Sequence, residues 1–162
     1  MLKIASFDPG ITTGFSLAIL DGATLFLACD EEKLSHRNLF DLLEEYAPQH
    51  VVCESFEYRN TRHRDNLELF SLELIGVIKL FDPNVNLQNA AKGKGFYNDQ
   101  KLKSMGLYVP GRNHGRDALR HLLHWWTFGP GYKYNVKGNV MLAQTETVLL
   151  KGDQDGVGQQ VR

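Results

Sequence analysis

Apolar and polar residues alternate with two different periods along this chain. Short runs rich in Ile, Leu, Val and Phe, broken by turn residues, are typical of β-strands. They predict strands at residues 2–8, 13–20, 23–29 and 50–56. Asp21-Gly22 predicts a tight hairpin between the second and third strands. The segment 50–56 is apolar at consecutive positions, as expected of a strand that helices cover on both faces.

Helical spacing of apolar residues marks a second group of segments. It predicts helices at residues 35–47, 65–81, 99–107 and 114–128. Ser35 is a suitable N-cap for the first helix, and Pro48 ends it. Asp99 is expected to cap the third helix, and Gly-Pro-Gly at 129–131 stops the last. Helix 65–81 has a wide apolar surface, which suits either a deep core position or a dimer face.

The remaining segments complete the expected architecture. Residues 85–90 predict a short fifth strand, and the Gly- and Lys-rich residues 91–98 predict a loop. Residues 140–150 are compatible with strand or helix, and 151–162 have the composition of a disordered tail. The order predicts an α/β fold: a five-stranded mixed sheet, with an antiparallel meander plus parallel strands, flanked by helices. We expect one domain over residues 1–130 and a C-terminal extension over 131–162.

Length and cysteine content suit a cytoplasmic protein. A chain of 162 residues buries roughly 70% of its unfolded surface and needs no disulfide to fold. Cys29 and Cys53 both lie in apolar strand segments, and no signal peptide precedes the first strand, so we expect reduced thiols. No apolar run approaches the roughly 20 residues of a membrane span, so no membrane association is expected.

The net charge of −1 hides an asymmetry along the chain. Residues 1–57 hold ten acids and three bases, whereas residues 86–137 hold nine bases and two acids. Such a local excess of bases favours a polyanionic partner such as nucleic acid. A solvated face is the plainer alternative.

Asp8 raises the main chemical question of this sequence. It interrupts an apolar strand, and a buried unpaired carboxylate costs several kcal/mol at least. Either a cation lies against it, or Asp8-Pro9-Gly10 forms a turn with its own hydrogen bonds. Glu54 ends a strand expected beside the first, and His114 and Asp117 share one helical face at i, i+3. These four side chains are therefore expected to converge.

Carboxylates with one imidazole suit hard divalent cations. Mg²⁺ or Mn²⁺ prefer such ligands, and two ions about 4 Å apart can clamp the attacking and leaving oxygens of a phosphodiester. His114 is also a candidate general base. Each residue has a plainer interpretation: Asp8 in a turn, Glu54 at a strand end, His114 on the surface, and Asp117 favoured by the helix dipole. The combination is more specific than any one member.

Three segments resemble the RuvC family of Holliday-junction resolvases, in a divergent form like those carried by bacteriophages. They are "SFDPGITTGFSLAIL", "VVCESFEYRN" and "HGRDALRHLLHW", and the resemblance spans about residues 1–128. It implies an RNase H-like fold, a homodimer, and metal-dependent cleavage of junction strands. It also implies that the catalytic and metal-binding residues are Asp8, Glu54, His114 and Asp117.

The resemblance also implies DNA-contacting residues. The expected backbone contacts are Arg59, Arg62, Arg64, Lys92, Lys94 and Lys101. Phe96-Tyr97 is a candidate for stacking on bases. Family members often place an aromatic residue three positions after the glutamate, where this chain has Glu57 between Phe56 and Tyr58. Tyr58 is therefore the candidate for this role, and helix 65–81 for the dimer face.

Other functions stay open at this point. Forks, flaps or structured RNA are alternative substrates for the same fold and site. "DPGITTG" is also similar to the phosphate-holding turn of actin-like ATPases and sugar kinases, but those enclose ATP between two such domains, and this chain has one copy of the pattern. A non-catalytic binder of branched nucleic acid is a further alternative, although clustered acids are not expected in one.

Overall fold

A mixed β-sheet forms the centre of the computed structural model, which describes residues 1–56, 69–134 and 140–143. The strands are β1 (Leu2–Asp8), β2 (Thr13–Asp21), β3 (Thr24–Glu32), β4 (His50–Glu54), β5 (Asn86–Gln88) and β6 (Val140–Leu142). The helices are α1 (His36–Tyr46), α2 (Leu69–Phe81), α3 (Ala90–Phe96), α4 (Asp99–Ser104), α5 (Asn113–Phe128) and the 3-10 helix η1 (Pro130–Tyr134). Among these elements, no helix is long and apolar enough to cross a bilayer.

The sheet has the order β5-β4-β1-β2-β3-β6, so β1 lies at its centre. β1, β2 and β3 pair antiparallel as a meander, whereas β4 and β5 add in parallel on the other side of β1. The predicted mixed α/β architecture is confirmed. The strand count of five was wrong, because β6 adds a sixth strand in parallel beside β3. This segment was one that the sequence left open between strand and helix.

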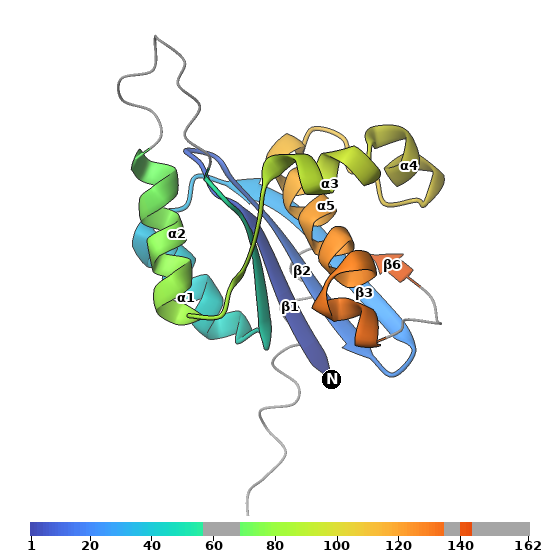
Figure 1. Cartoon of the computed structure of the whole chain (residues 1–162), viewed down its shortest axis with the longest axis horizontal. Helices are drawn as coiled ribbons and strands as arrows, with labels where there is room; N and C mark the ends of the chain where they lie inside the picture. Colours follow the sequence, from blue (N-terminus) through green and yellow to red (C-terminus); the bar gives the residue numbers. More distant parts are fainter. Residues whose placement is uncertain (57–68, 135–139, 144–162) are drawn as a thin grey trace, which may run out of the picture.

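Helices cover both faces of the sheet (Figure 1). α1 and α2 lie on one face, and α3, α4 and α5 lie on the other. Alternate residues of β1 therefore enter two cores: Phe7 packs with the α1 and α2 side, and Ile4 packs with the α5 side. Trp125 is the largest fully buried residue of the α5 side. This sandwich explains why β4 is apolar on both faces.

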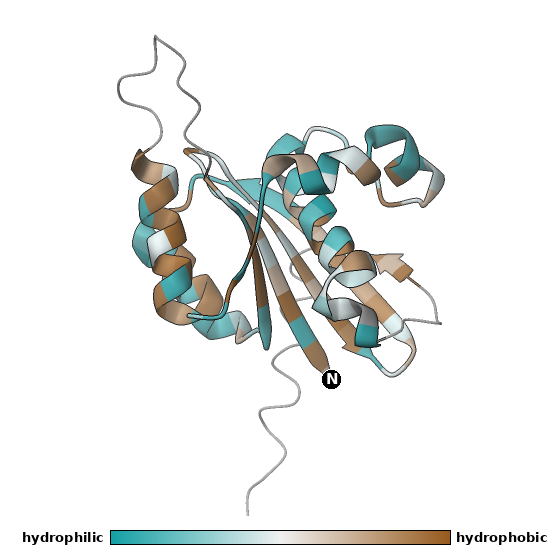
Figure 2. Ribbon diagram, in the orientation of Figure 1, coloured by the Kyte–Doolittle hydropathy of each residue, from teal (hydrophilic) through white to brown (hydrophobic). Residues whose placement is uncertain are grey.

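Helix α2 has more apolar surface than the sheet covers. Leu74 and Ile78 are fully buried, whereas Leu69 and Leu80 are 68% and 76% exposed. Figure 2 shows apolar colouring over much of α2, in contrast to the mainly hydrophilic α4. The expected helix 65–81 is thus present from Leu69 onward, and its first residues lie outside the described part of the chain.

Helix α3 replaces the loop predicted at 91–98, so that prediction was wrong. Asn89 caps the helix, since its side chain accepts a hydrogen bond from the backbone N–H of Lys92 at 3.1 Å. Gly93 faces α5, where an added Cβ would lie 3.0 Å from Cβ of Arg120. The glycine that suggested a loop is therefore what lets two helices pack closely.

The observed caps agree in part with those expected. Ser35 caps α1 by accepting a hydrogen bond from the backbone N–H of Asn38 at 3.1 Å, as predicted. Asp99 does not cap α4, because Asn98 does so by accepting from the backbone N–H of Lys101 at 2.9 Å. Asp99 is instead the first residue of the helix, where a negative charge suits the helix dipole.

Strand β3 extends further than the sequence predicts. β3 runs to Glu32, three residues beyond Cys29, because its antiparallel pairing with β2 continues to Thr13.

Both Cys29 and Cys53 are buried free thiols. The thiols are therefore unpaired, as expected.

Two glycines let the first turn of α5 lie directly on the sheet. A Cβ at Gly14 in β2 would be 2.0 Å from the backbone carbon and oxygen of His114. A Cβ at Gly115 would be 2.6 Å from the backbone oxygen of Asp30 in β3. Because backbone atoms cannot move aside as a flexible side chain can, only glycine fits at either position. This contact sets the position of His114 above the end of β1.

Gly14→Ala is expected to destabilise the fold. The added methyl group must push the start of α5 off β2, and such overpacking typically costs about 1–3 kcal/mol, occasionally more. Urea unfolding measures the change. Gly76→Ala in α2 is the control, since a Cβ there meets nothing within 4 Å and Ala favours a helix by roughly 1 kcal/mol. Equal stability of the Gly14→Ala protein and the wild type would show that α5 does not rest on β2 in this way.

Candidate active site

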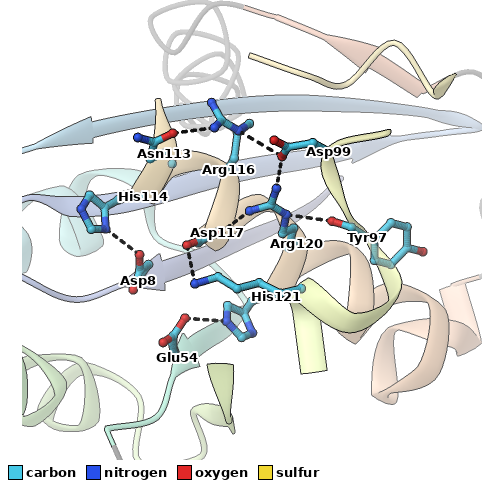
Figure 3. Close-up of polar contacts among 12 residues, drawn as sticks. Asp8, Glu54, Tyr97, Asp99, Asn113, His114, Arg116, Asp117, Arg120 and His121 are labelled. Atoms are coloured by element: carbon cyan, nitrogen blue, oxygen red, sulfur yellow. Dashed lines mark hydrogen bonds and ion pairs between the residues drawn. The ribbon is translucent and has the colours of Figure 1, made fainter. Parts of the chain in front are cut away.

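The four predicted site residues come from three elements that meet at one end of the sheet (Figure 3). Asp8 ends β1 and Glu54 ends β4, and the parallel register pairs the residues just before them, Phe7 with Cys53. Both carboxylates therefore leave the sheet on the α5 face. His114 and Asp117 lie in the first turns of α5 above them. The structure thus brings the four residues to the same end of the sheet, and their shared role as ligands stays a prediction.

Asp8 is paired with His114 rather than closing a turn. Its Oδ2 lies 2.9 Å from Nδ1 of His114, and the two side chains are 14% and 49% exposed. The turn after β1 is closed by the hydroxyl of Thr13, which donates to the backbone oxygen of Gly10 at 2.9 Å. Of the two explanations for Asp8 that the sequence allowed, the structure favours a basic partner.

Asp117 contacts two basic side chains. Nζ of Lys94 in α3 lies 2.7 Å from its Oδ2, and the guanidinium of Arg120 contacts its Oδ1. Arg120 is itself buried, and it also binds Asp99 and donates from Nε to the backbone oxygen of Tyr97 at 2.7 Å. Arg120 thus ties Asp117 of α5 to the start of α4.

Glu54 has a buried partner that the sequence did not identify. Its Oε2 lies 2.9 Å from Nε2 of His121, a residue with no solvent exposure. The other ring nitrogen of His121 lies 3.1 Å from Oε1 of Gln88, at the end of β5. The three side chains form one polar row beneath α5.

Burial and the neighbouring charges alter the protonation of Asp8 and Lys94. Burial raises the pKa of Asp8 to about 6, and the negative charges of Glu54 and Asp117 act in the same direction against the opposing effect of His114. Burial alone would lower the pKa of Lys94. The hydrogen bond and charge of Asp117, with the charges of Glu54 and Asp8, outweigh burial and raise it. The Lys94 ammonium therefore lies in the field of all three carboxylates.

A residue from β3 caps the helix that supplies half of the site. Oε2 of Glu31 accepts hydrogen bonds from the backbone N–H groups of His114 and Gly115, at 2.7 Å and 3.4 Å. Arg112, at the N-cap position, makes no side-chain capping bond. Glu31 therefore satisfies donors that the helix cannot satisfy itself, and it complements the positive end of the helix dipole.

The donor set fits a hard divalent cation in its chemistry. Three carboxylates and an imidazole are typical ligands of Mg²⁺ or Mn²⁺, and the raised pKa of Asp8 reflects its burial first and the neighbouring carboxylates second. Within the described ranges, however, no three Asp, Glu, His or Cys side chains lie close enough together to hold an ion as they stand. Each carboxylate has a basic partner instead, so ion binding requires some of these side chains to turn.

The structure allows a partial test of the predicted DNA contacts. Tyr58, Arg59, Arg62 and Arg64, with Glu57, lie outside the described residues. Lys92 is exposed on α3, whereas Nζ of Lys101 lies 3.2 Å from the ring centre of Phe96. A base cannot stack on Tyr97 in this conformation, because Tyr97 is only 4% exposed and its hydroxyl is hydrogen-bonded to the hydroxyl of Thr127 at 2.6 Å. Phe96 is 42% exposed, and its role stays a prediction.

Four residues that contact the site were not predicted from the sequence, and spacing along the chain could have identified two of them. Arg120 and His121 follow Asp117 at i+3 and i+4, so they share its helical face. That spacing could have marked them as neighbours of the site. Gln88 and Glu31 reach the site only through strand order, and no local pattern indicates them.

Comparison with known proteins shows similarity in structure alone. No protein-family model matches the chain, and no curated protein matches it by sequence. The structure is similar to that of T. thermophilus RuvC in complex with Holliday junction substrate, with a TM-score of 0.60 and 17% identity, covering 83% of this chain and 98% of that one. It is also similar to a second Thermus thermophilus RuvC structure, with a TM-score of 0.58 and 17% identity, covering 78% and 95%. The chain thus has a RuvC-like, RNase H-like fold.

Asp8→Asn is expected to stabilise the protein in EDTA at neutral pH. The folded state holds the proton of Asp8 up to about pH 6 but the unfolded state only to 3.8, so ionisation destabilises the fold as pH rises through this window. The gain should be about 2–3 kcal/mol at pH 7.5, and it should shrink to roughly 1 kcal/mol at pH 4.5. Urea unfolding at both pH values measures it.

Asp21→Asn provides the matched control for this measurement. Asp21 is exposed at the β2–β3 turn, so the same change there should leave stability nearly unaltered at either pH. A loss of stability in Asp8→Asn at pH 7.5 would mean that the contact of Asp8 with His114 outweighs the cost of its burial.

Proposed function

We propose that this protein is a metal-dependent, structure-selective endodeoxyribonuclease that resolves Holliday junctions by paired phosphodiester hydrolysis. One observation carries the proposal: on a RuvC-like fold, three carboxylates and one histidine from β1, β4 and α5 gather at one end of the sheet. The basic residues of α3 and α4 beside this cluster suit a phosphate backbone.

In this proposal the carboxylates of Asp8, Glu54 and Asp117, with His114, hold Mg²⁺ or Mn²⁺, with two ions in each site. Such ions activate a water molecule and stabilise the charge that develops on the phosphate. Asp8 must lose its proton before it can act as a ligand, and its raised pKa makes that step dependent on pH below about 6. His114 binds Asp8 through Nδ1, so Nε2 is the atom that would either bind an ion or, where it binds none, accept a proton from water.

Lys94 has a place in the same scheme. Its ammonium now balances Asp117, and it is half exposed. With the carboxylates holding a divalent ion, Asp117 would no longer need Lys94 as its counter-charge, and the Lys94 side chain could turn toward a DNA phosphate. Lys94, with Lys92 and Lys101, would then give affinity that does not depend on sequence.

A homodimer is part of the proposal, because two sites related by a two-fold axis can cut two symmetry-related strands. The exposed leucines of α2 support it. Leu69, Leu72 and Leu80 are 68%, 43% and 76% exposed on one helix. Exposed apolar surface that gathers on one helix is typical of a protein–protein contact.

A non-catalytic binder of branched nucleic acid is the second candidate. It is favoured by the finding that every carboxylate of the cluster already has a basic partner. In a binder these ion pairs would be permanent. In a nuclease they must open for the ions.

Cleavage of a labelled four-way DNA junction tests the main proposal. We expect paired nicks near the centre in Mg²⁺ or Mn²⁺ and none in EDTA. Asp8→Asn and Asp117→Asn should lower the rate at least ~100-fold, since changes behind metal ligands alone typically cost about 10–100-fold. Asp21→Asn is the control and should cut normally.

The same assay separates the alternatives. Binding of the junction without cleavage by any variant would favour the non-catalytic binder. A fork, a flapped duplex and an RNA junction as competing substrates would show which branched nucleic acid is preferred. Wild-type cleavage that Asp8→Asn does not alter would disprove the proposed site.

Salt dependence tests the proposed phosphate contacts. Lys92→Gln should weaken junction binding for all sequences alike and lower the slope of log K against log salt by about 1. Lys33→Gln, an exposed lysine beyond the end of β3, should leave the slope unchanged. Fluorescence anisotropy in Ca²⁺ or EDTA from 50 to 200 mM salt measures both. Equal slopes for the two variants would remove Lys92 from the interface.

A further inference from the structure

His121 is a fully buried polar residue in the middle of α5. It lies one helical turn after Asp117, on the side of the helix that faces the ends of β4 and β5. Neighbouring positions of α5 on the sheet side hold apolar residues such as Leu119 and Leu122. An apolar side chain would therefore suit position 121 on packing grounds alone.

Each ring nitrogen of His121 faces a side-chain oxygen. Nε2 lies 2.9 Å from Oε2 of Glu54, and Nδ1 lies 3.1 Å from Oε1 of Gln88. Glu54 and Gln88 are register partners on parallel strands, so both side chains leave the same face of the sheet. The amide of Gln88 in turn donates to Oδ1 of Asn86 at 3.2 Å.

The strand ends beneath His121 are also held in place. The backbone N–H of Ser55 donates to the backbone oxygen of Gln88 at 2.6 Å, which ties the end of β4 to β5. Gln88 is only 3% exposed. His121 therefore rests on a fixed base, with one ring nitrogen toward that base and the other toward Glu54.

A carboxylate that must bind an ion gains from such a partner. A carboxylate that binds an ion is ionised and only accepts hydrogen bonds, so in that state Nε2 of His121 would donate to Oε2 of Glu54. A free glutamate side chain loses rotamer entropy when it is ordered. Holding one oxygen in advance removes most of that cost and leaves the other oxygen as the ligand.

His121 differs from the other basic partners of the cluster. Lys94 and His114 are half exposed, so a divalent cation could replace them at their carboxylates. His121 has no exposure, so it can neither leave the site nor reach a phosphate. It is therefore the partner suited to remain on its carboxylate when an ion binds.

We infer that His121 is a positioning residue that orients Glu54 for divalent-ion binding through its Nε2, with Gln88 holding the opposite side of the ring. This inference rests on the proposed function. The alternative is a purely structural role, in which His121 only joins α5 to β4 and β5. The structural role predicts a change in stability but no change in metal affinity that depends on which ring nitrogen is replaced.

Two amide substitutions separate these roles. In His121→Gln the side-chain amide reaches the place of Nε2 and can still donate to Glu54. In His121→Asn it reaches only the place of Nδ1 and Gln88. We expect His121→Asn and His121→Leu to raise the dissociation constant of Mn²⁺ about 10–100-fold, and His121→Gln to stay within roughly threefold of wild type.

Calorimetric titration of the full chain with Mn²⁺, without DNA, measures these constants, and urea unfolding reports the stability of each variant. The same substitutions in a Glu54→Gln background should have no further effect on Mn²⁺ affinity, because His121 acts through that carboxylate. The Mn²⁺ concentration for half-maximal cleavage should rise in parallel with the dissociation constant.

Each outcome decides the matter. Equal Mn²⁺ affinity of the Asn and Gln variants, whether both are weakened or both unchanged, would overturn the inference and leave the proposed function standing. An undiminished effect of His121→Asn in the Glu54→Gln background would also overturn it. A wild-type protein that binds no Mn²⁺ and cuts no junction would overturn the proposed function, and this inference with it.

Discussion

The candidate site depends on the contact between the first turn of α5 and the backbone of β2 and β3. Gly14 and Gly115 permit this contact, because a Cβ at either would overlap backbone atoms of the facing element. Glu31 then holds the helix end by accepting its unpaired N–H groups. The helix is fixed at its start, so His114 reaches Asp8 and one turn later Asp117 reaches the same region. Without this contact, the α5 side chains would not lie over the strand ends.

Negative charge at the strand ends is the second constraint. Burial raises the pKa of Asp8, and the negative charges of Glu54 and Asp117 act in the same direction. Placing these acids together therefore has an electrostatic cost. The structure relieves it with bases of two kinds. Lys94 and His114 are half exposed and can be exchanged for an ion, whereas Arg120 and His121 are buried and hold their carboxylates from behind. The proposed cation site depends on this division between half-exposed and buried partners.

Fold and chemistry contribute separately to the proposed function. Structural similarity to T. thermophilus RuvC at 17% identity establishes the fold alone. The chemistry is argued from the side chains of this chain: oxygen ligands, a histidine at the edge, and bases on α3 and α4. The fold and the side-chain chemistry both point to the same end of the sheet, and neither alone would support a junction nuclease.

The sequence by itself determined most of the elements and the candidate ligand set. Local patterns of apolar residues located strands β1 to β5 and helices α1, α2, α4 and α5. Most of these elements bury one face, which leaves apolar residues at regular spacing, and β4 is recognised by consecutive apolar residues because both of its faces are covered. Asp8, Glu54, His114 and Asp117 were recognised because carboxylates are unexpected at strand ends in apolar segments, and because i, i+3 spacing places two residues on one helical face.

Only the tertiary structure decided which residues support that set. Helix α3 was taken for a loop, since its glycines are unfavourable in a helix until α5 packs against Gly93. Glu31, Gln88 and His121 meet their partners across 83, 33 and 67 positions of the chain. Such contacts follow from strand order and helix placement, which no local pattern encodes. The candidate ligands were therefore readable from the sequence, while the residues that contact them from the other elements emerged only from the packed fold.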